Sequence, residues 1–241
     1  MYFTGSAVPA VISFIRLPIF TRYFTPEEYG LFSLVSGTYV FLSMFLFSWI
    51  ASCLWRFYTE ANNNNLLNQL YANLFVLFVA GSVILMLISL IWLLFTGSKI
   101  VLLLVILSFF QIVTSQILNL YLIVKRINGK ALLYNSFAII QAVGAFVILI
   151  LLTFKFNLRI ESVLYGQIVV NLLLLIIIAP KIRYSFFSVS HFNRNWINKI
   201  FRYGTVGLIT NFCILLLISA DRYIIAIFRE YQKLVFIIKL I

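Results

Sequence analysis

The chain has 241 residues, of which 63% are hydrophobic and only 10% are charged, and its formal net charge is +12. Soluble domains are nearer half apolar and a quarter charged, so this composition excludes a soluble globular protein. In a soluble protein such a charge would suggest nucleic acid. In a membrane protein it reflects basic loops and attraction to anionic lipid or substrate, so we expect no nucleic-acid partner.

Seven apolar segments approach the length of about 20 residues that a membrane-spanning helix needs. Backbone groups must be satisfied inside lipid, and the runs are too long and unbroken for an outer-membrane barrel. We therefore predict an all-α fold, a polytopic membrane helix bundle. The predicted helices cover residues 5–23, 31–54, 70–96, 100–123, 132–154, 162–179 and 203–220.

Lysine and arginine are distributed unequally between the breaks that separate these helices. The breaks after the second, fourth and sixth helices hold nine basic residues, and those after the odd-numbered helices hold five. The positive-inside rule places the richer side, and with it the N-terminus, in the cytoplasm. In the long basic break between the sixth and seventh helices we expect an amphipathic piece with Phe186, Phe187, Phe192 and Trp196 dipping into lipid.

The stretch "TRYFTPEEYG", residues 21–30, predicts a tight turn between the first two helices. Thr25 and Glu28 have the spacing of a capping box, and Pro26 suits the first position of the next helix. Arg22 lies at the carbonyl end of the preceding helix, where a cation is favoured.

Polar side chains inside the predicted spans are the candidates for function. Arg16 lies about 9 Å from Arg22 along the first helix. An arginine there either faces a bundle interior or snorkels to the interface. Pro18, two residues later, is expected to kink this helix. The amides either line a path or hold helices together; they are Gln111, Gln116, Asn119, Asn135, Gln141, Gln167, Asn171 and Asn211. The two cysteines have no metal or redox spacing, and we expect neither metal nor cofactor.

Two motifs together resemble a known family. "LPIFTRYFTPEEYGLFSL" resembles the N-terminal signature of polysaccharide biosynthesis proteins, the Wzx-like oligosaccharide flippases, and "SADRYIIAIF" resembles their second signature at the end of the seventh helix. The superfamily also holds multidrug exporters of the MATE type and lipid II flippases. The resemblance implies two six-helix lobes in a bacterial inner membrane. It implies alternating access without ATP, which moves undecaprenyl-diphosphate-linked oligosaccharide from the cytoplasmic to the periplasmic face for O-antigen, capsule or exopolysaccharide. A polysaccharide polymerase and chain-length proteins are implied as candidate partners.

If flipping is the task, arginine suits the diphosphate because its fork binds pairs of oxygens. Arg16 is then the first candidate for the substrate path, with Arg22 and Arg222 at the outer mouth and Asp221 as a partner for Arg222. The amides Gln116, Asn119, Asn135, Gln141 and Asn211 are candidates to bind sugar hydroxyls.

The sequence departs from the family after Phe228, where the family continues into an eighth helix. "REYQKLVFIIKLI" is too short and too charged to span. We therefore expect a truncated protein: a six-helix transmembrane lobe (1–180), a basic linker (181–202), and a seventh helix with the start of an incomplete second lobe (203–241).

The alternatives are an inactive or partner-dependent half-transporter, and a MATE-type exporter. The exporter is disfavoured because all six acids lie in breaks or the tail. A membrane glycosyltransferase or polymerase is disfavoured because no outer break exceeds about ten residues, and such enzymes need a larger external loop or a catalytic domain. We do not expect an enzyme.

Overall fold

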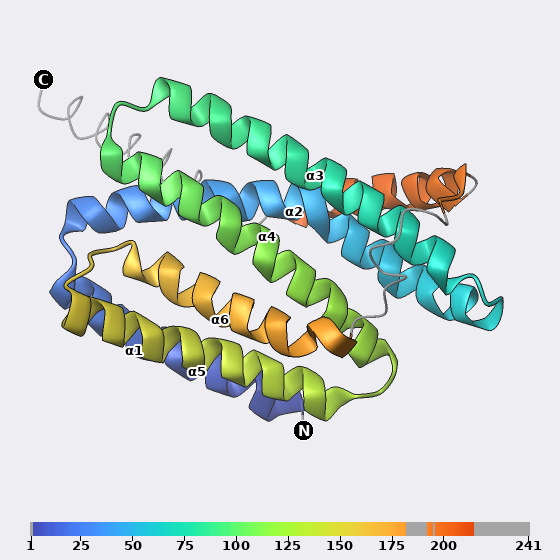
Figure 1. Ribbon diagram of the computed structural model, residues 1–241, viewed down its shortest axis with the longest axis horizontal. Helices are drawn as coiled ribbons and strands as arrows, with labels where there is room; N and C mark the ends of the chain where they lie inside the picture. Colours follow the sequence, from blue (N-terminus) through green and yellow to red (C-terminus); the bar gives the residue numbers. More distant parts are fainter. Residues whose placement is uncertain (1, 182–191, 195, 215–241) are drawn as a thin grey trace, which may run out of the picture.

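The computed structural model describes residues 2–181, 192–194 and 196–214, and its regular structure there is all helical (Figure 1). The helices are α1 (Tyr2–Tyr23), α2 (Pro26–Asn63), α3 (Leu67–Phe95), α4 (Lys99–Ile127), α5 (Ala131–Phe156) and α6 (Ser162–Ile178), followed by the short 3-10 helix η1 (Ala179–Lys181). Residues 196–214 are also helical. The prediction of an all-α membrane helix bundle is confirmed.

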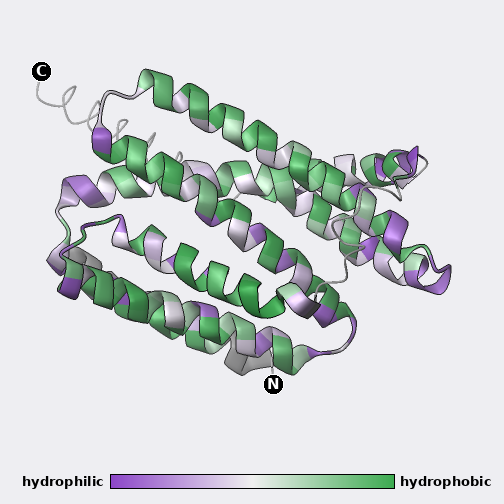
Figure 2. Cartoon of the chain, viewed as in Figure 1, coloured by the Kyte–Doolittle hydropathy of each residue, from purple (hydrophilic) through white to green (hydrophobic). Residues whose placement is uncertain are grey.

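Four helices, α2 to α5, are long and apolar enough to cross a membrane. Helix α6 has 17 residues, about 25 Å of helix, and the apolar stretch of α1 covers only Ala7–Arg16. The expectation that each segment is a full-length span is therefore not met by these two helices. Figure 2 shows hydrophobic residues along most of each helix and hydrophilic residues gathered at the turns.

The helices form two groups that meet at α4. Helix α1 lies along α5, and α5 packs against α6; α2, α3 and α4 pack against one another. Helix α4 also contacts α5 and α6 and so joins the groups (Figure 1). The α1–α2, α3–α4 and α5–α6 connections lie at one end of the bundle, and the α2–α3 and α4–α5 connections at the other.

Helix α2 is longer than the sequence indicated, because it continues to Asn63 rather than ending near residue 54. Its 38 residues give about 57 Å of helix, well beyond a hydrocarbon core of about 30 Å. The asparagine run then makes a sharp turn: Asn64 caps α2, and Asn65 adopts a left-handed φ of 56°. Asparagine tolerates that conformation better than most residues.

The projecting end of α2 explains why one prediction about Trp196 was wrong. Trp196 does not dip into lipid; it is buried, and its ring meets that of Phe57 edge-on at 6.0 Å. The Lys199 ammonium lies 5.3 Å from both ring centroids and pairs with Glu60. The long α2 offers a protein surface where lipid was expected. Phe192 is exposed, and Phe186 and Phe187 lie outside the described residues.

The contact between α5 and α6 depends on small residues. A Cβ atom at Gly166 would lie 2.9 Å from the carbonyl oxygen of Ala145 and 3.3 Å from the backbone nitrogen of Leu149. Small residues at such crossings let two membrane helices approach closely. Gly166 is therefore required by packing and not by a turn.

We predict that Gly166→Ala lowers the stability of the protein by about 1–3 kcal/mol, because the added methyl meets backbone that cannot rotate away. Gly37→Ala is the matched control, because a Cβ there meets nothing within 4 Å and alanine is the better helix former. Thermal unfolding in detergent measures both. Equal effects of the two substitutions would contradict the assigned contact.

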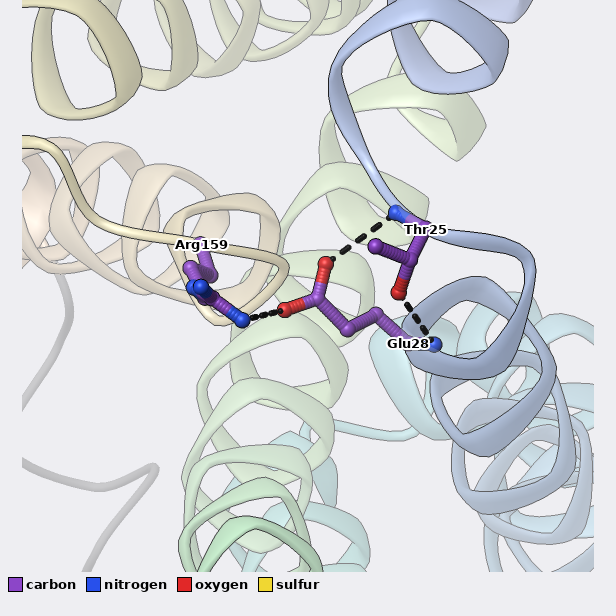
Figure 3. A network of polar contacts seen from close by, with 3 residues as sticks. All are labelled: Thr25, Glu28 and Arg159. Carbon is purple, nitrogen blue, oxygen red and sulfur yellow. Dashed lines mark hydrogen bonds and ion pairs between the residues drawn. The ribbon is translucent and has the colours of Figure 1, made fainter.

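A hydrogen-bonded network joins the α1–α2 turn to the α5–α6 loop (Figure 3). The predicted capping box is confirmed: the Glu28 backbone N–H donates to Thr25 Oγ1 at 3.3 Å, and the Thr25 N–H donates to the Glu28 carboxylate at 3.2 Å. The other carboxylate oxygen accepts from Arg159 Nη1 at 2.7 Å. The Glu28 carboxylate thus takes part in the N-terminal cap of α2 and also binds Arg159 in the α5–α6 loop.

Glu28 is ionised at neutral pH in this network. Burial raises its pKa, but hydrogen bonds from the Thr25 N–H and the Arg159 guanidinium outweigh burial and leave the pKa below its ordinary value. A carboxyl group whose folded pKa is lowered stabilises the fold above its unfolded pKa of about 4.3 and loses that contribution as the pH falls.

We predict that Glu28→Ala lowers stability by about 1–2 kcal/mol, through the lost cap and the lost partner of Arg159. Glu28→Gln should cost less, because its amide oxygen still accepts at the cap and the Arg159 side chain is 72% exposed, where an ion pair adds little. Thermal unfolding in detergent at pH 7 gives the values. The difference between wild type and Glu28→Ala should shrink below about pH 4.

Glu27→Ala is the control, because Glu27 is the exposed neighbour in the same first turn. If Glu27→Ala destabilises the protein as much as Glu28→Ala, the network is not what holds this end together.

Candidate functional site

A pocket of about 300 Å³ lies between α1, α4, α5 and α6. Its lining residues come from all four helices: Pro9, Arg16, Gln111, Ala138, Gln141, Ala142, Ala145 and Gln167. Its size is at the lower end of the ~300–1,000 Å³ typical of small-molecule sites. The lining contains one cation and three amides and no acidic residue, which is unusual for a region built from apolar helices.

Arg16 supplies the positive charge. It is half-buried, and its Nε atom is buried without a hydrogen-bond partner. Neither ion pair found among the described residues includes it. An arginine inside a membrane bundle is costly and usually faces the interior or a water-filled cavity. Its guanidinium therefore has donors available for a ligand.

Prolines and alanines explain how the pocket forms. Pro9 and Pro18 lie within the continuous helix α1 on either side of Arg16, and Pro9 lines the pocket; a proline within a helix removes a backbone hydrogen bond. On α5, the three lining alanines have the i, i+4, i+7 spacing of one helix face. They are Ala138, Ala142 and Ala145. Small side chains on this face leave room between α5 and its neighbours.

Gln141 belongs to a chain of hydrogen bonds that runs from the pocket into the bundle. Its Nε2 donates to Asn171 Oδ1 on α6 at 2.7 Å, and Asn171 Nδ2 donates to Thr114 Oγ1 on α4 at 3.4 Å. The Thr114 hydroxyl donates to the Phe110 carbonyl at 2.8 Å. Asn171 is fully buried. Three helices are thus tied together behind the pocket.

Gln111 and Gln167 differ from Gln141. Both are half-buried, and in the described part of the chain neither makes a side-chain hydrogen bond. Their amides provide donors and acceptors that can rotate to suit a ligand. Together with Arg16 they suit a polar anion that also has hydroxyl groups. Among the described residues no group of His, Cys, Asp or Glu is placed to hold a metal ion.

The structure separates the residues selected from the sequence. Arg16 and Gln141 share the pocket, whereas Arg22 is exposed at the end of α1. The other four described residues lie elsewhere. On α4, Gln116 is half-buried and Asn119 exposed; Asn135 is buried in α5; and Asn211 donates to Ser48 of α2 at 2.5 Å. Asp221 and Arg222 lie outside the described residues.

Gln111 and Gln167 were among the amides expected either to line a path or to hold helices together, but they were not carried into the shorter list of substrate-path candidates, although both line the pocket. Their own positions did not separate them from the other amides, because a polar residue in a membrane helix is as often a packing residue. The sequence feature that could have identified the pocket is the alanine face of α5. It surrounds Gln141 and marks the side of α5 that faces other polar residues.

Comparison with known proteins gives the family. The model of a family described as "Polysaccharide biosynthesis protein" matches residues 1–234. The chain belongs to this family. A search of curated proteins and a search of solved structures each gave no match.

Family membership and the apolar helices together make this a membrane protein of polysaccharide biosynthesis or transport. The resemblance drawn from the two motifs is thereby confirmed at the level of the family. The pocket with Arg16 lies within the matched region.

We predict that Arg16→Leu leaves the protein as stable as wild type or stabilises it by about 1 kcal/mol, because a half-buried charge that makes no ion pair within the described residues is replaced by an apolar side chain. Arg22→Leu is the control on the same helix. It should be neutral or destabilising, because a cation at a helix C-terminus is favourable. Thermal unfolding in detergent compares them. A clear loss of stability in Arg16→Leu alone would make Arg16 a structural residue.

Proposed function

We propose that this protein translocates undecaprenyl-diphosphate-linked oligosaccharide across the bacterial inner membrane, from the cytoplasmic to the periplasmic face. The observation that supports this most is the pocket, in which a partly desolvated Arg16 and three glutamines lie between membrane helices. Family membership supports the link to polysaccharide. The distribution of basic residues supports a cytoplasmic N-terminus.

The chemistry of the pocket fits the polar head of such a substrate. A diphosphate is an anion whose oxygens accept hydrogen bonds, and a guanidinium donates to a pair of them. Sugar hydroxyls donate and accept, as the glutamine amides do. The substrate's lipid tail stays in the bilayer, so the protein has to shelter only the head. No covalent step is needed, and we propose a transporter and not an enzyme.

Proteoliposomes test the proposal. The purified full chain is reconstituted with undecaprenyl diphosphate that bears a labelled oligosaccharide, and a glycosidase outside the vesicles measures the fraction of substrate that is exposed. Translocation should raise this fraction from about half to nearly all, and Arg16→Gln should slow the rise about tenfold or more, because one charged hydrogen-bonding group is lost.

Arg56→Gln is the charge-matched control, because Arg56 is an exposed residue of α2 outside the pocket. Its rate should equal that of wild type. A rate for the wild-type chain equal to that of protein-free vesicles would overturn the proposed function. Equal slowing by the two substitutions would overturn the role of Arg16.

A further inference from the structure

The hydrogen bonds behind the pocket fix the direction in which the Gln141 amide points. The Thr114 hydroxyl hydrogen is directed to carbonyls of its own helix, those of Phe110 at 2.8 Å and Gln111 at 3.1 Å. Toward α6 this oxygen can therefore only accept. It accepts from Asn171 Nδ2, so the other end of the Asn171 amide, Oδ1, faces α5.

Asn171 Oδ1 in turn needs a donor, and Gln141 Nε2 is that donor at 2.7 Å. An amide that uses its nitrogen in this way leaves its carbonyl oxygen for the other side. Gln141 lines the pocket, so its Oε1 is the acceptor that remains available there. The Thr114 hydroxyl thus fixes the orientation of the Asn171 amide, and the Asn171 amide fixes which end of the Gln141 amide faces the pocket.

A fixed acceptor distinguishes between the parts of a sugar diphosphate. Phosphate oxygens at neutral pH mainly accept hydrogen bonds, so a carbonyl oxygen held in place does not suit them. A sugar hydroxyl donates and does suit it. Gln111 and Gln167, which make no side-chain hydrogen bonds within the described residues, can turn to either group.

We propose that Asn171 is a positioning residue: it holds the Gln141 carbonyl oxygen in the pocket, where that oxygen accepts a hydrogen bond from a hydroxyl of the sugar next to the diphosphate. This inference rests on the proposed function, because it takes a lipid-linked sugar as the ligand. Asn171 itself is fully buried and acts through Gln141.

The experiment measures the preference for sugar with two defined probes. These are undecaprenyl diphosphate and the same lipid with one N-acetylglucosamine attached, each bound to the full chain in lipid nanodiscs. The sugar preference is the ratio of the two dissociation constants. Wild type should prefer the glycosylated probe about fivefold or more, which is about the contribution of one hydrogen bond.

Asn171→Leu and Gln141→Leu should each bring the preference close to one while leaving the affinity for undecaprenyl diphosphate within about twofold. The double variant should be no worse than either single variant, because two residues that act through one contact are not additive. Thr114→Val tests the same role while keeping both amides. It removes the acceptor that orients the Asn171 amide, so this amide can adopt either orientation, and the sugar preference should fall about twofold.

Thr153→Val is the matched structural control. Thr153 and Ser162 form another buried hydrogen bond between α5 and the start of α6, at 3.0 Å, and neither residue lines the pocket. This variant should keep the sugar preference of wild type even if its stability falls.

The outcomes separate the two proposals. If wild type binds neither probe, the proposed ligand is wrong and the positioning role falls with it. If wild type binds both probes without preference for the sugar, only the positioning role is overturned. If wild type prefers the sugar, two results would overturn the positioning role alone. Either Asn171→Leu keeps this preference, or Thr153→Val loses it as well. Additive losses in the double variant would overturn it as well.

Discussion

Hydrocarbon offers no hydrogen bonds, and this constraint decides where each polar side chain of the bundle lies. Thr114, Gln141 and Asn171 turn toward one another between α4, α5 and α6 and satisfy most of their hydrogen-bonding groups there. The Arg16 Nε atom is buried and makes no hydrogen bond within the described residues, as is also true of Asn73 Oδ1 and Ser108 Oγ elsewhere in the bundle. Of these three atoms only Arg16 Nε belongs to a charged group, and only Arg16 lines the pocket. A charge inside a membrane bundle is costly and usually faces the interior or a water-filled cavity.

The ends of the bundle follow the opposite rule, because water and headgroups accept charge there. Glu28 caps α2 and binds Arg159 of the α5–α6 loop, and Lys199 pairs with Glu60 near the C-terminal end of α2. Each pair links a helix end to a segment more than a hundred residues away in the sequence. The Glu28–Arg159 pair thus connects the two helix groups at the surface, and the Glu60–Lys199 pair connects α2 to the helix of residues 196–214.

The sequence predicted the features that depend on local physics. Hydropathy located the helices, and the Thr25–Glu28 spacing gave the capping box correctly. It did not predict the length of α2 or the burial of Trp196, because both depend on contact between α2 and the segment that follows residue 195. It selected Arg16 and Gln141 but grouped them with Gln116 and Asn119, which lie outside the pocket. Which face of a membrane helix meets another helix depends on packing, and composition alone does not determine it.

Packing and the pocket are coupled through α5. Ala145 lines the pocket, and its carbonyl oxygen is also the atom that a side chain at Gly166 would strike. Gly166 therefore allows α6 to approach α5, and that approach brings Asn171 within 2.7 Å of Gln141. If α6 moved outward by an ångström or two, the hydrogen bond would break and the Gln141 amide would be free to turn. The same small residues that hold α5 and α6 together thus fix the acceptor in the pocket, so a rearrangement of this helix pair would change what the pocket can bind.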